Sequence, residues 1–557
     1  MPWQRKRQFA STSTGFMVAG PDGERWLLTN AHAVEYGTQI KVKRRGDDTK
    51  FLATVLAAGT ECDIALLSVA DPEFWEGAAP LTLGGLPRLQ EAVAVVGYPI
   101  GGDTISVTSG VVSRIEVTAY VHGSTELLGI QVSAAINSGN SGGPCFNAGG
   151  ECVGVAFQSM AGSDAENIGY VIPTPVVRVS SCGERERENE RKRGAPVVRA
   201  NKKKAYLSSL SSFFFSLQHF LTDYARHGQV TGFPVLGIKW QRLESAALRA
   251  ACGLAPGEKG VLVRSVAPTA ASSGILAPDD VITAFDGVPV ANDGTVLFRT
   301  GERIAFGHLI SQKYTGERAA VTVVRRGSSG ESGGGGAAAA PQPLTLDVAL
   351  SPPAPLVPAH LMGADPEYLV VAGAVFVALS EPYLASEYGP DYLSDSPVKL
   401  LDKLLHGWRT APGEEVVVLS QVLACDEALG YEDLCNVQVL ALNGARVHNL
   451  AHLAALVAAA ETAARADGGR AFLKLSLEYD EVVVLDAAAA RAATATILAQ
   501  HSIPAAVSPG LASQLEGAGL PVWPAGPGGD ASVLVSGGGG GGAGAAAEVA
   551  AVPAAAA

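Results

Sequence analysis

The sequence predicts a mainly β protein with additional α+β domains, and two features of its patterning carry this prediction. Residues 1 to about 178 hold short apolar runs separated by Gly, Asp, Asn and Pro, with no long apolar stripe at helical spacing. Such a pattern is typical of an antiparallel sandwich or barrel. Residues from about 229 to 350 instead alternate strand-like and helix-like segments, and residues from about 355 to 490 repeat that order loosely, as a diverged second copy would.

Length and composition agree with several domains that each bury a core. At about 150 residues per domain, 557 residues suggest three or four domains. A hydrophobic share of 47% against 17% charged residues excludes wholesale disorder. The net charge of −13 argues against a protein devoted to nucleic acid, although a local basic patch stays open. Seven irregularly spaced cysteines without a CxxC exclude a disulfide framework and favour a reducing, intracellular compartment.

The elements of the first region follow from its β-branched and aromatic residues. Strands are expected around Val18 and at 26–28, 40–42, 64–67, 92–96 and 153–156. After this region, residues 184–193 form a dense run of mixed charges, followed by three lysines at 202–204 and a Ser/Phe-rich stretch. A solvated linker is the favoured interpretation, and a nuclear-import signal is the alternative.

The later regions are punctuated by glycine-containing loops. Strands are expected at 260–263, 280–287, 320–324, 344–348 and 437–444, with helices at 302–311 and 450–459. From Pro504 onward there is no Lys or Arg and much Gly and Ala, so most of this tail is expected to be disordered. No apolar stretch of about 20 residues predicts a membrane span, and no signal peptide is evident.

The string Asn-Ser-Gly-Asn-Ser-Gly-Gly-Pro at 137–144 carries the strongest chemical signal. A nucleophilic serine needs an exposed hydroxyl on a tight turn, with backbone N–H groups converging beside it, and flanking glycines permit that geometry. Ser141 is therefore the candidate nucleophile, and the N–H groups of Gly139 and Ser141 are the candidate oxyanion hole. The competing interpretation is an ordinary Gly/Ser-rich turn.

Two further strings supply partners for such a serine. His32 follows a predicted strand within Thr-Asn-Ala-His-Ala-Val and can act as general base and then acid. Asp63 begins an apolar strand in Cys-Asp-Ile-Ala-Leu-Leu and can accept from the imidazole, which holds the ring in one tautomer. Taken alone, each is more often a packed histidine or a turn aspartate. Together with Ser141 they indicate a catalytic triad.

These strings resemble the trypsin-like serine proteases, and in detail the HtrA/Deg branch. Asn140, where trypsin has Asp, also favours that branch. Further strings, at 96–99, 110–114, 167–173, 231–237, 310–316, 429–433 and 499–504, resemble the plant and algal Deg proteases with one protease and two PDZ-like domains. The resemblance covers residues 2 to about 510. It implies a chymotrypsin-like double β-barrel at 1–178, an insertion or linker at 179–217, PDZ-like domains at 218–350 and 351–510, and a tail at 511–557.

The resemblance also implies a function. It implies an ATP-independent serine endopeptidase that degrades damaged, unfolded or regulatory proteins, prefers small aliphatic P1 residues, and forms a homo-oligomer built on trimers or a tetramer. Lys259, Gly260, Val261 and Leu262 would form the loop of the first PDZ-like domain that captures a peptide carboxylate, with an ordinary hairpin loop as the alternative. The second PDZ-like domain is expected to serve assembly or regulation. No cofactor and no metal site is expected, because no P-loop, dinucleotide fingerprint or convincing ligand spacing occurs.

Two departures from the family pattern leave rival interpretations open. The strand that relatives carry before Pro2 is missing, so the first barrel could lack an edge strand, and residues 179–217 interrupt a normally direct connection. One rival is a chaperone or peptide-binding scaffold whose protease site is poorly assembled. The other is a nuclear regulatory protein that uses its basic clusters to bind nucleic acid. The resemblance favours the nucleus or nucleolus as the compartment, with the plastid as the alternative.

Overall fold

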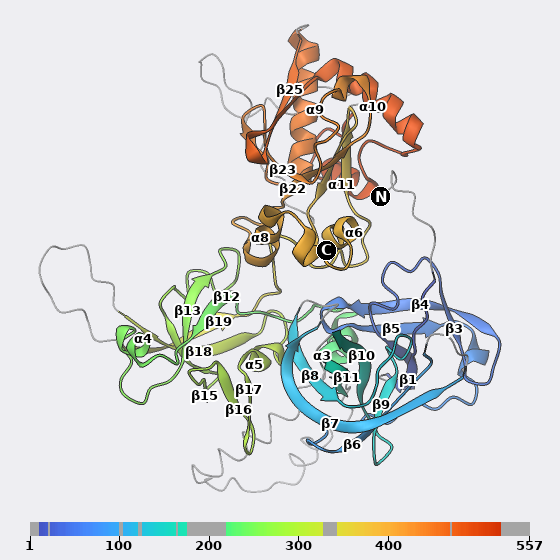
Figure 1. Ribbon diagram of the computed structural model, residues 1–557, viewed down its shortest axis with the longest axis vertical. Coiled ribbons are helices and arrows are strands. Elements are labelled where there is room, and N and C mark those ends of the chain that lie inside the picture. Colours follow the sequence, from blue (N-terminus) through green and yellow to red (C-terminus); the bar gives the residue numbers. More distant parts are fainter. Residues whose placement is uncertain are drawn as a thin grey trace, which may run out of the picture. The chain divides into compact units, whose positions relative to one another are not determined.

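The computed structural model describes residues 10–20, 23–99, 104–120, 125–162, 165–174, 219–326, 342–467 and 470–524 (Figure 1). The side chains of residues 158–167, 342 and 464–467 lie outside this description. The chain divides into two compact units, one within residues 9–353 and the other mainly within residues 354–557. The predicted insertion at 179–217 lies outside the described residues.

The first sheet of the larger unit is antiparallel, with the strand order β1-β2-β5-β4-β3. Its strands are β1 (Phe16–Ala19), β2 (Arg25–Thr29), β3 (Ile40–Lys43), β4 (Lys50–Gly59) and β5 (Ile64–Val69). Strand β5 is a continuous apolar run because both of its faces are covered. Ile64 and Leu66 enter one core cluster, whereas Ala65 and Leu67 enter another. Among the described residues β1 and β3 are the edges of this sheet. The expectation that a strand before Pro2 is lacking stays a prediction.

The second sheet closes into a barrel with the order β10-β11-β8-β7-β6-β9. Its strands are β6 (Ala92–Gly97), β7 (Ser106–Ala119), β8 (Glu126–Val132), β9 (Pro144–Asn147), β10 (Cys152–Gly162) and β11 (Ala165–Pro173). Alternate side chains such as Val93, Val95, Ile130 and Val132 fill its interior. Closure leaves no unpaired edge in this sheet. The prediction of an antiparallel β domain is confirmed, and each of the six strands expected in the first region is present.

Helix α3 (His219–His227) packs its apolar side chains into the core beside the first sheet, and its His219 also bonds to the carbonyl of Lys313 and stacks on Tyr314 in the following region. Phe220 and Leu221 are fully buried in that core, in the same cluster as Cys62 and Phe233. Helix α3 therefore contacts both regions, with its apolar face on the core beside β5, and the domain boundary predicted at residue 218 stays a prediction.

The segment that follows α3 is held by a carboxylate of the first sheet region. Glu61, in the short 3-10 helix η2 (Thr60–Cys62), accepts a hydrogen bond from the backbone N–H of Phe233 at 2.5 Å. Burial raises the pKa of Glu61, the Phe233 bond opposes that rise, and the nearby Asp223 adds to it. Asp223 is itself fully buried and bonds to the backbone N–H of Thr231 and to His227.

Replacing Glu61 with glutamine should make the free energy of unfolding less sensitive to rising pH. Because the pKa of Glu61 is higher in the folded than in the unfolded protein, the folded protein holds the carboxyl proton more tightly. The stabilisation that the protonated Glu61 gives the fold is fully present below the ordinary pKa of 4.5. It is lost as pH rises through the raised pKa. Glutamine removes the charge and keeps an acceptor for Phe233. Urea unfolding at pH 4.5 and 7.5 should show the variant gaining stability relative to wild type at the higher pH. Glu24→Gln at an exposed position is the control, and a relative loss for Glu61→Gln at pH 7.5 would contradict the expectation.

The first PDZ-like domain is built on a sheet of order β12-β13-β14-β18-β19, with β15 paired to β14. Its strands are β12 (Ile238–Arg242), β13 (Val261–Val266), β14 (Val281–Phe285), β15 (Val288–Pro289), β18 (Arg318–Arg325) and β19 (Gln342–Ala349). Helices α4 (Ala246–Ala251) and α5 (Gly307–Ser311) and the hairpin β16 (Thr295–Arg299) and β17 (Glu302–Ala305) complete it. The helix predicted at 302–311 is wrong in its first half, because those residues pair with β16 and only the second half is helical.

The second unit carries a sheet of order β20-β21-β22-β23-β25-β26, with β24 paired to β23. Its strands are β20 (Tyr368–Val371), β21 (Ala374–Ala378), β22 (Val417–Val422), β23 (Val437–Leu442), β24 (Ala445–Arg446), β25 (Phe472–Leu477) and β26 (Val482–Asp486). Its helices are α6 (Glu381–Tyr388), α7 (Tyr392–Asp395), α8 (Val398–His406), α9 (Leu450–Asp467), α10 (Ala487–His501) and α11 (Pro509–Gly517). Within this unit α9 packs against strands β20, β21, β23 and β25 (Figure 1).

The predicted tail begins too early. Leu511 and Leu515 of α11 are fully buried, and Trp523 is 1% exposed and donates its indole N–H to the carbonyl of Val370. This segment belongs to the core of the second unit, because its apolar side chains outweigh its Gly/Ala-rich composition. Residues 525–557 lie outside the described part of the chain. In the described part, no helix has the combination of length and apolarity that crossing a bilayer requires.

Candidate active site

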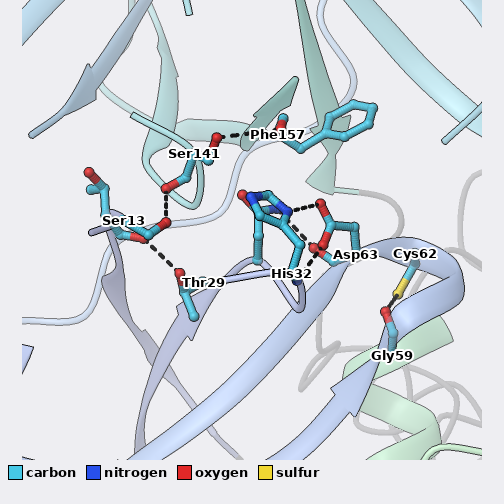
Figure 2. A network of polar contacts seen from close by, with 10 residues as sticks. Ser13, Thr29, His32, Gly59, Cys62, Asp63, Ser141 and Phe157 are labelled. Atoms are coloured by element: carbon cyan, nitrogen blue, oxygen red, sulfur yellow. Dashed lines mark hydrogen bonds and ion pairs between the residues drawn. The ribbon is translucent and has the colours of Figure 1, made fainter. Parts of the chain in front are cut away.

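The first sheet brings His32 and Asp63 together. Strand β2 ends at Thr29 and β5 begins at Ile64, and these neighbouring antiparallel strands pair Thr29 with Ala65. The residues just after β2 and just before β5 therefore meet at one end of the sheet. The backbone N–H of His32 donates to Oδ1 of Asp63 at 2.9 Å, and Nδ1 of His32 lies 2.7 Å from Oδ2 (Figure 2).

Burial makes this pairing obligatory for Asp63. Its side chain is inaccessible to water, and a buried carboxylate is costly unless its oxygens accept hydrogen bonds. His32 supplies a donor to each oxygen, and Asn30 donates its side-chain amide to the Asp63 carbonyl at 2.8 Å. Because the ionised carboxylate can only accept, the imidazole proton must lie on Nδ1, which leaves Nε2 as an acceptor.

The loop between β8 and β9 that carries Ser141 is packed so closely that glycine is required. Gly142 has φ +82°, and a Cβ there would lie 2.1 Å from the carbonyl oxygen of Thr14 and 3.2 Å from the backbone nitrogen of Asn30. A Cβ on Gly143 would lie 2.2 Å from the carbonyl oxygen of Val96. Gly142 thus allows the Ser141 turn to press against the end of β2, which leads into His32, and Gly143 allows it to press against β6.

The hydroxyl of Ser141 has a weak protein partner. Ser141 Oγ donates to the carbonyl of Phe157 over 3.4 Å, near the limit for such a bond. In the view of Figure 2 the His32 ring lies between Asp63 and Ser141. All three candidate catalytic residues thus belong to one region at the junction of the two sheets.

Two backbone N–H groups of the same loop have no acceptor among the described residues. Asn140 donates its N–H to Asn137, Gly142 to Ala156, and Gly143 to Asn140. Within the described part of the chain, no group accepts from the N–H of Gly139 or of Ser141. Partly buried N–H groups without a partner are uncommon, and a developing oxyanion is a fitting acceptor for them.

Sequence reasoning missed the polar residues that support this site. Thr14 and Ser13 bond to the Ser141 loop, and Asn30 bonds to the Asp63 backbone. The Ser/Thr-rich string before β1 was the available signal for the first two. Among the described residues, no group of three or more His, Cys, Asp or Glu side chains is arranged to hold a metal ion.

The loop predicted to capture a peptide carboxylate leads into an interior strand. Lys259 and Gly260 precede β13, and Val261 and Leu262 begin it. Val261 and Leu262 pair with β12 on one side and with β14 on the other, so β13 has no free edge there to which a peptide strand could be added. The edge strand of this sheet is β12.

Comparisons with known proteins agree with this architecture. The trypsin-like peptidase domain family matches residues 13–155, and the PDZ domain family matches residues 357–510. Among solved structures, the HtrA-type protease AlgW with tripeptide covers 62% of this chain and 96% of its own, at 23% identity and a TM-score of 0.41.

Relatives of known identity match over much longer stretches. Protease Do-like 2, chloroplastic, of Arabidopsis thaliana is 47% identical over 504 residues, which cover 90% of this chain and 71% of the relative. Protease Do-like 4, mitochondrial, of the same plant is 37% identical over 505 residues, 91% and 81% of the two chains. The chain therefore belongs to the Do-like, or Deg/HtrA, family of trypsin-like serine endopeptidases.

Proposed function

We propose that His32, Asp63 and Ser141 are the catalytic triad of this endopeptidase. The observation that carries the proposal is the double hydrogen bond by which buried Asp63 holds both the backbone and the ring of His32. That bond places the ring proton on Nδ1, so Nε2 is the nitrogen that can accept a proton from a serine hydroxyl. The packing of the Ser141 turn against the end of β2 supports Ser141 as that serine.

The reaction then follows from the geometry. His32 Nε2 takes the proton of Ser141 Oγ as the oxygen attacks the scissile carbonyl, and Asp63 stabilises the resulting imidazolium. The N–H groups of Gly139 and Ser141 receive the negative oxygen of the tetrahedral intermediate. His32 next protonates the leaving amine as the C–N bond breaks. A water molecule, deprotonated by His32, hydrolyses the acyl-enzyme and regenerates Ser141.

A fluorophosphonate probe separates this proposal from a peptide-binding scaffold with a poorly assembled site. An assembled triad forms a covalent adduct with the probe at its serine, because the probe needs an activated hydroxyl and an oxyanion hole. Mass spectrometry should locate the adduct at Ser141. Binding of denatured protein without an adduct would favour the scaffold.

We further propose that the first PDZ-like domain captures peptide segments along the exposed edge of β12. An extended peptide adds to a sheet through the unpaired backbone groups of an edge strand. Trp240, on β12, is partly exposed and packs edge-on against Phe306 at the start of α5, with ring centroids 5.4 Å apart. Phe306 is buried, so this contact fixes the exposed Trp240 ring beside the edge strand, where it would contact a bound peptide.

Loss of the Trp240 ring should weaken peptide binding. Trp240→Ala should raise the Kd of a fluorescent peptide with a hydrophobic free C-terminus by about 10-fold, as for an aromatic anchor. Fluorescence anisotropy measures this, and Lys259→Ala, in the loop before the interior strand, is the control expected to bind normally. If Lys259→Ala weakened binding and Trp240→Ala did not, the β12 edge would be the wrong site.

The remaining properties extend the family relationship to this chain. We propose unfolded or regulatory proteins as substrates and a homo-oligomer, trimer-based or tetrameric, with the second PDZ-like domain serving assembly. The relatives named above carry chloroplastic and mitochondrial designations, which support the plastid over the nucleus or nucleolus as the compartment. Light scattering of the purified protein tests the oligomer, and a fluorescent fusion of the chain tests the compartment.

A further inference from the structure

The short polar string before β1 lies against the Ser141 loop. Thr14 is 5% exposed, and its backbone N–H donates to the carbonyl of Ser141 at 2.9 Å. The hydroxyl of the exposed Ser13 donates to the same carbonyl at 2.6 Å. Two donors from one segment therefore fix the peptide unit that follows Ser141.

The side chain of Thr14 fixes a second peptide unit of the loop. Its hydroxyl donates to the carbonyl of Gly139 at 2.7 Å and accepts from the backbone N–H of Tyr98 at 2.9 Å. The bond from Tyr98 points one lone pair of the hydroxyl toward β6, so its proton is directed at Gly139. The backbone N–H of Tyr98, just after β6, thus orients the hydroxyl of Thr14.

The remaining acceptor of Thr14 connects the loop to the histidine. The hydroxyl of Thr29 donates to the carbonyl of Thr14 at 2.7 Å, and Thr29 is the last residue of β2, three positions before His32. Thr14 consequently uses its N–H, its carbonyl and both functions of its hydroxyl in hydrogen bonds. One residue links β6, the end of β2 and the Ser141 loop.

Fixing these two carbonyls constrains the atoms that react. The carbonyls of Gly139 and Ser141 belong to the peptide units on either side of the Asn140–Ser141 unit, which supplies the N–H of Ser141. The carbonyl of Asn140 is held in turn by Gly143. With three successive units held, the backbone torsions on both sides of Ser141 are fixed, and so are the directions of its Cα–Cβ bond, which carries Oγ, and of its N–H. Small displacements of a reacting group lower rates steeply.

We infer that Thr14 is a positioning residue for the nucleophile and the oxyanion hole of this protease. The inference rests on the proposed role of Ser141. Thr14 touches neither substrate nor reacting atoms, and acts by holding the carbonyls of Gly139 and Ser141. Its hydroxyl, rather than its size, is the functional feature.

A pair of substitutions separates the hydroxyl from the volume. Thr14→Val keeps the shape and removes the hydroxyl, and should lower kcat per titrated active site by roughly 10- to 100-fold, below the effect of deleting an oxyanion donor outright. KM should stay within about two-fold, since ground-state binding is untouched. Thr14→Ser keeps the hydroxyl and should restore kcat to within a few-fold of wild type. A peptide boronate, whose adduct resembles the tetrahedral intermediate, should lose affinity for Thr14→Val in parallel with kcat/KM.

The matched control is Thr174→Val, in the same barrel region. Thr174 is also buried, and its hydroxyl bonds to the carbonyls of Gly84 and Val153, away from the Ser141 loop. Thr174→Val should lower the melting temperature as Thr14→Val does, but it should leave kcat unchanged. If Thr14→Val does not fold, Ser13→Ala at the exposed partner should lower kcat by a few-fold on its own.

The outcomes distinguish this inference from the assignment of the triad. If Ser141→Ala is inactive and Thr14→Val turns over like wild type per titrated site, the positioning role is wrong and the triad stands. The inference is also overturned if Thr14→Ser is as slow as Thr14→Val, because the hydroxyl then carries no effect, or if Ser13→Ala is fully active where Thr14→Val cannot be tested. If Ser141→Ala keeps its activity, the proposed nucleophile is wrong and the inference falls with it.

Discussion

Replacing Ser141 with alanine should lower kcat for casein hydrolysis by at least about 10⁴-fold, the scale on which triad serines fail. Alanine removes the only atom that forms the acyl-enzyme and keeps the backbone N–H of residue 141 and the turn around it. The change adds no volume, so the close packing at Gly142 and Gly143 is undisturbed. Timed release of soluble peptides measures the loss, and the fluorophosphonate adduct should disappear with it.

A matched serine elsewhere in the barrel controls for the loss of a hydroxyl. Ser113, on β7, is exposed, and Ser113→Ala should cleave casein at the wild-type rate. Thermal unfolding of both variants should resemble that of wild type, since exposed or lightly bonded hydroxyls contribute little to stability. Casein turnover by Ser141→Ala within about ten-fold of wild type would reject Ser141 as the nucleophile.

The strands of the protease domain could be predicted because successive side chains of a strand face opposite sides of the sheet, so a strand buried on both faces is a short run of apolar residues. In β5, Ile64 and Leu66 face one core and Ala65 and Leu67 another, and that continuous apolar run is visible in the sequence. The segment 302–305 was mistaken for helix although its pairing with β16 is a local hairpin, whose turn contains Gly301 at φ +81°. Trp523 was assigned to a tail because its core lies about 150 residues away in sequence, at Val370.

Some residues of the candidate site could be predicted from the sequence and others could not. His32, Asp63 and Ser141 could be nominated because their three strings combine into one mechanism, although His32 or Asp63 alone would have been taken for a packed histidine or a turn aspartate. Thr14 bonds to residues 125 and 127 positions later, and no periodicity or spacing encodes that contact. The position of the peptide site could not be predicted for a related reason, because whether β13 or β12 forms the edge of the sheet depends on strand order.

Replacing Asp63 with asparagine should lower kcat by about 10⁴-fold, through the proton on the imidazole rather than through a loss of fold. Asp63 accepts from two donors of His32, its backbone N–H and its Nδ1. Asparagine offers one acceptor oxygen and one NH₂ group. If the oxygen keeps the backbone N–H, the NH₂ group faces Nδ1 and donates to it, so the ring proton moves to Nε2. Nε2 then presents a proton to Ser141 where it must accept one.

The control for this substitution is an aspartate that accepts backbone hydrogen bonds outside the site. Asp71 caps the 3-10 helix η3 (Pro72–Trp75) by accepting from the N–H of Glu73, and Asp71→Asn should keep full kcat, because asparagine is also a good cap. Asp63→Asn should fold, since the two side chains have nearly the same shape, and should react slowly with the fluorophosphonate. A kcat within about ten-fold of wild type would mean that Asp63 does not set the tautomer of His32. Nε2 of His32 would then accept the proton of Ser141 without help from the Asp63 carboxylate, and the role proposed for that carboxylate would be wrong.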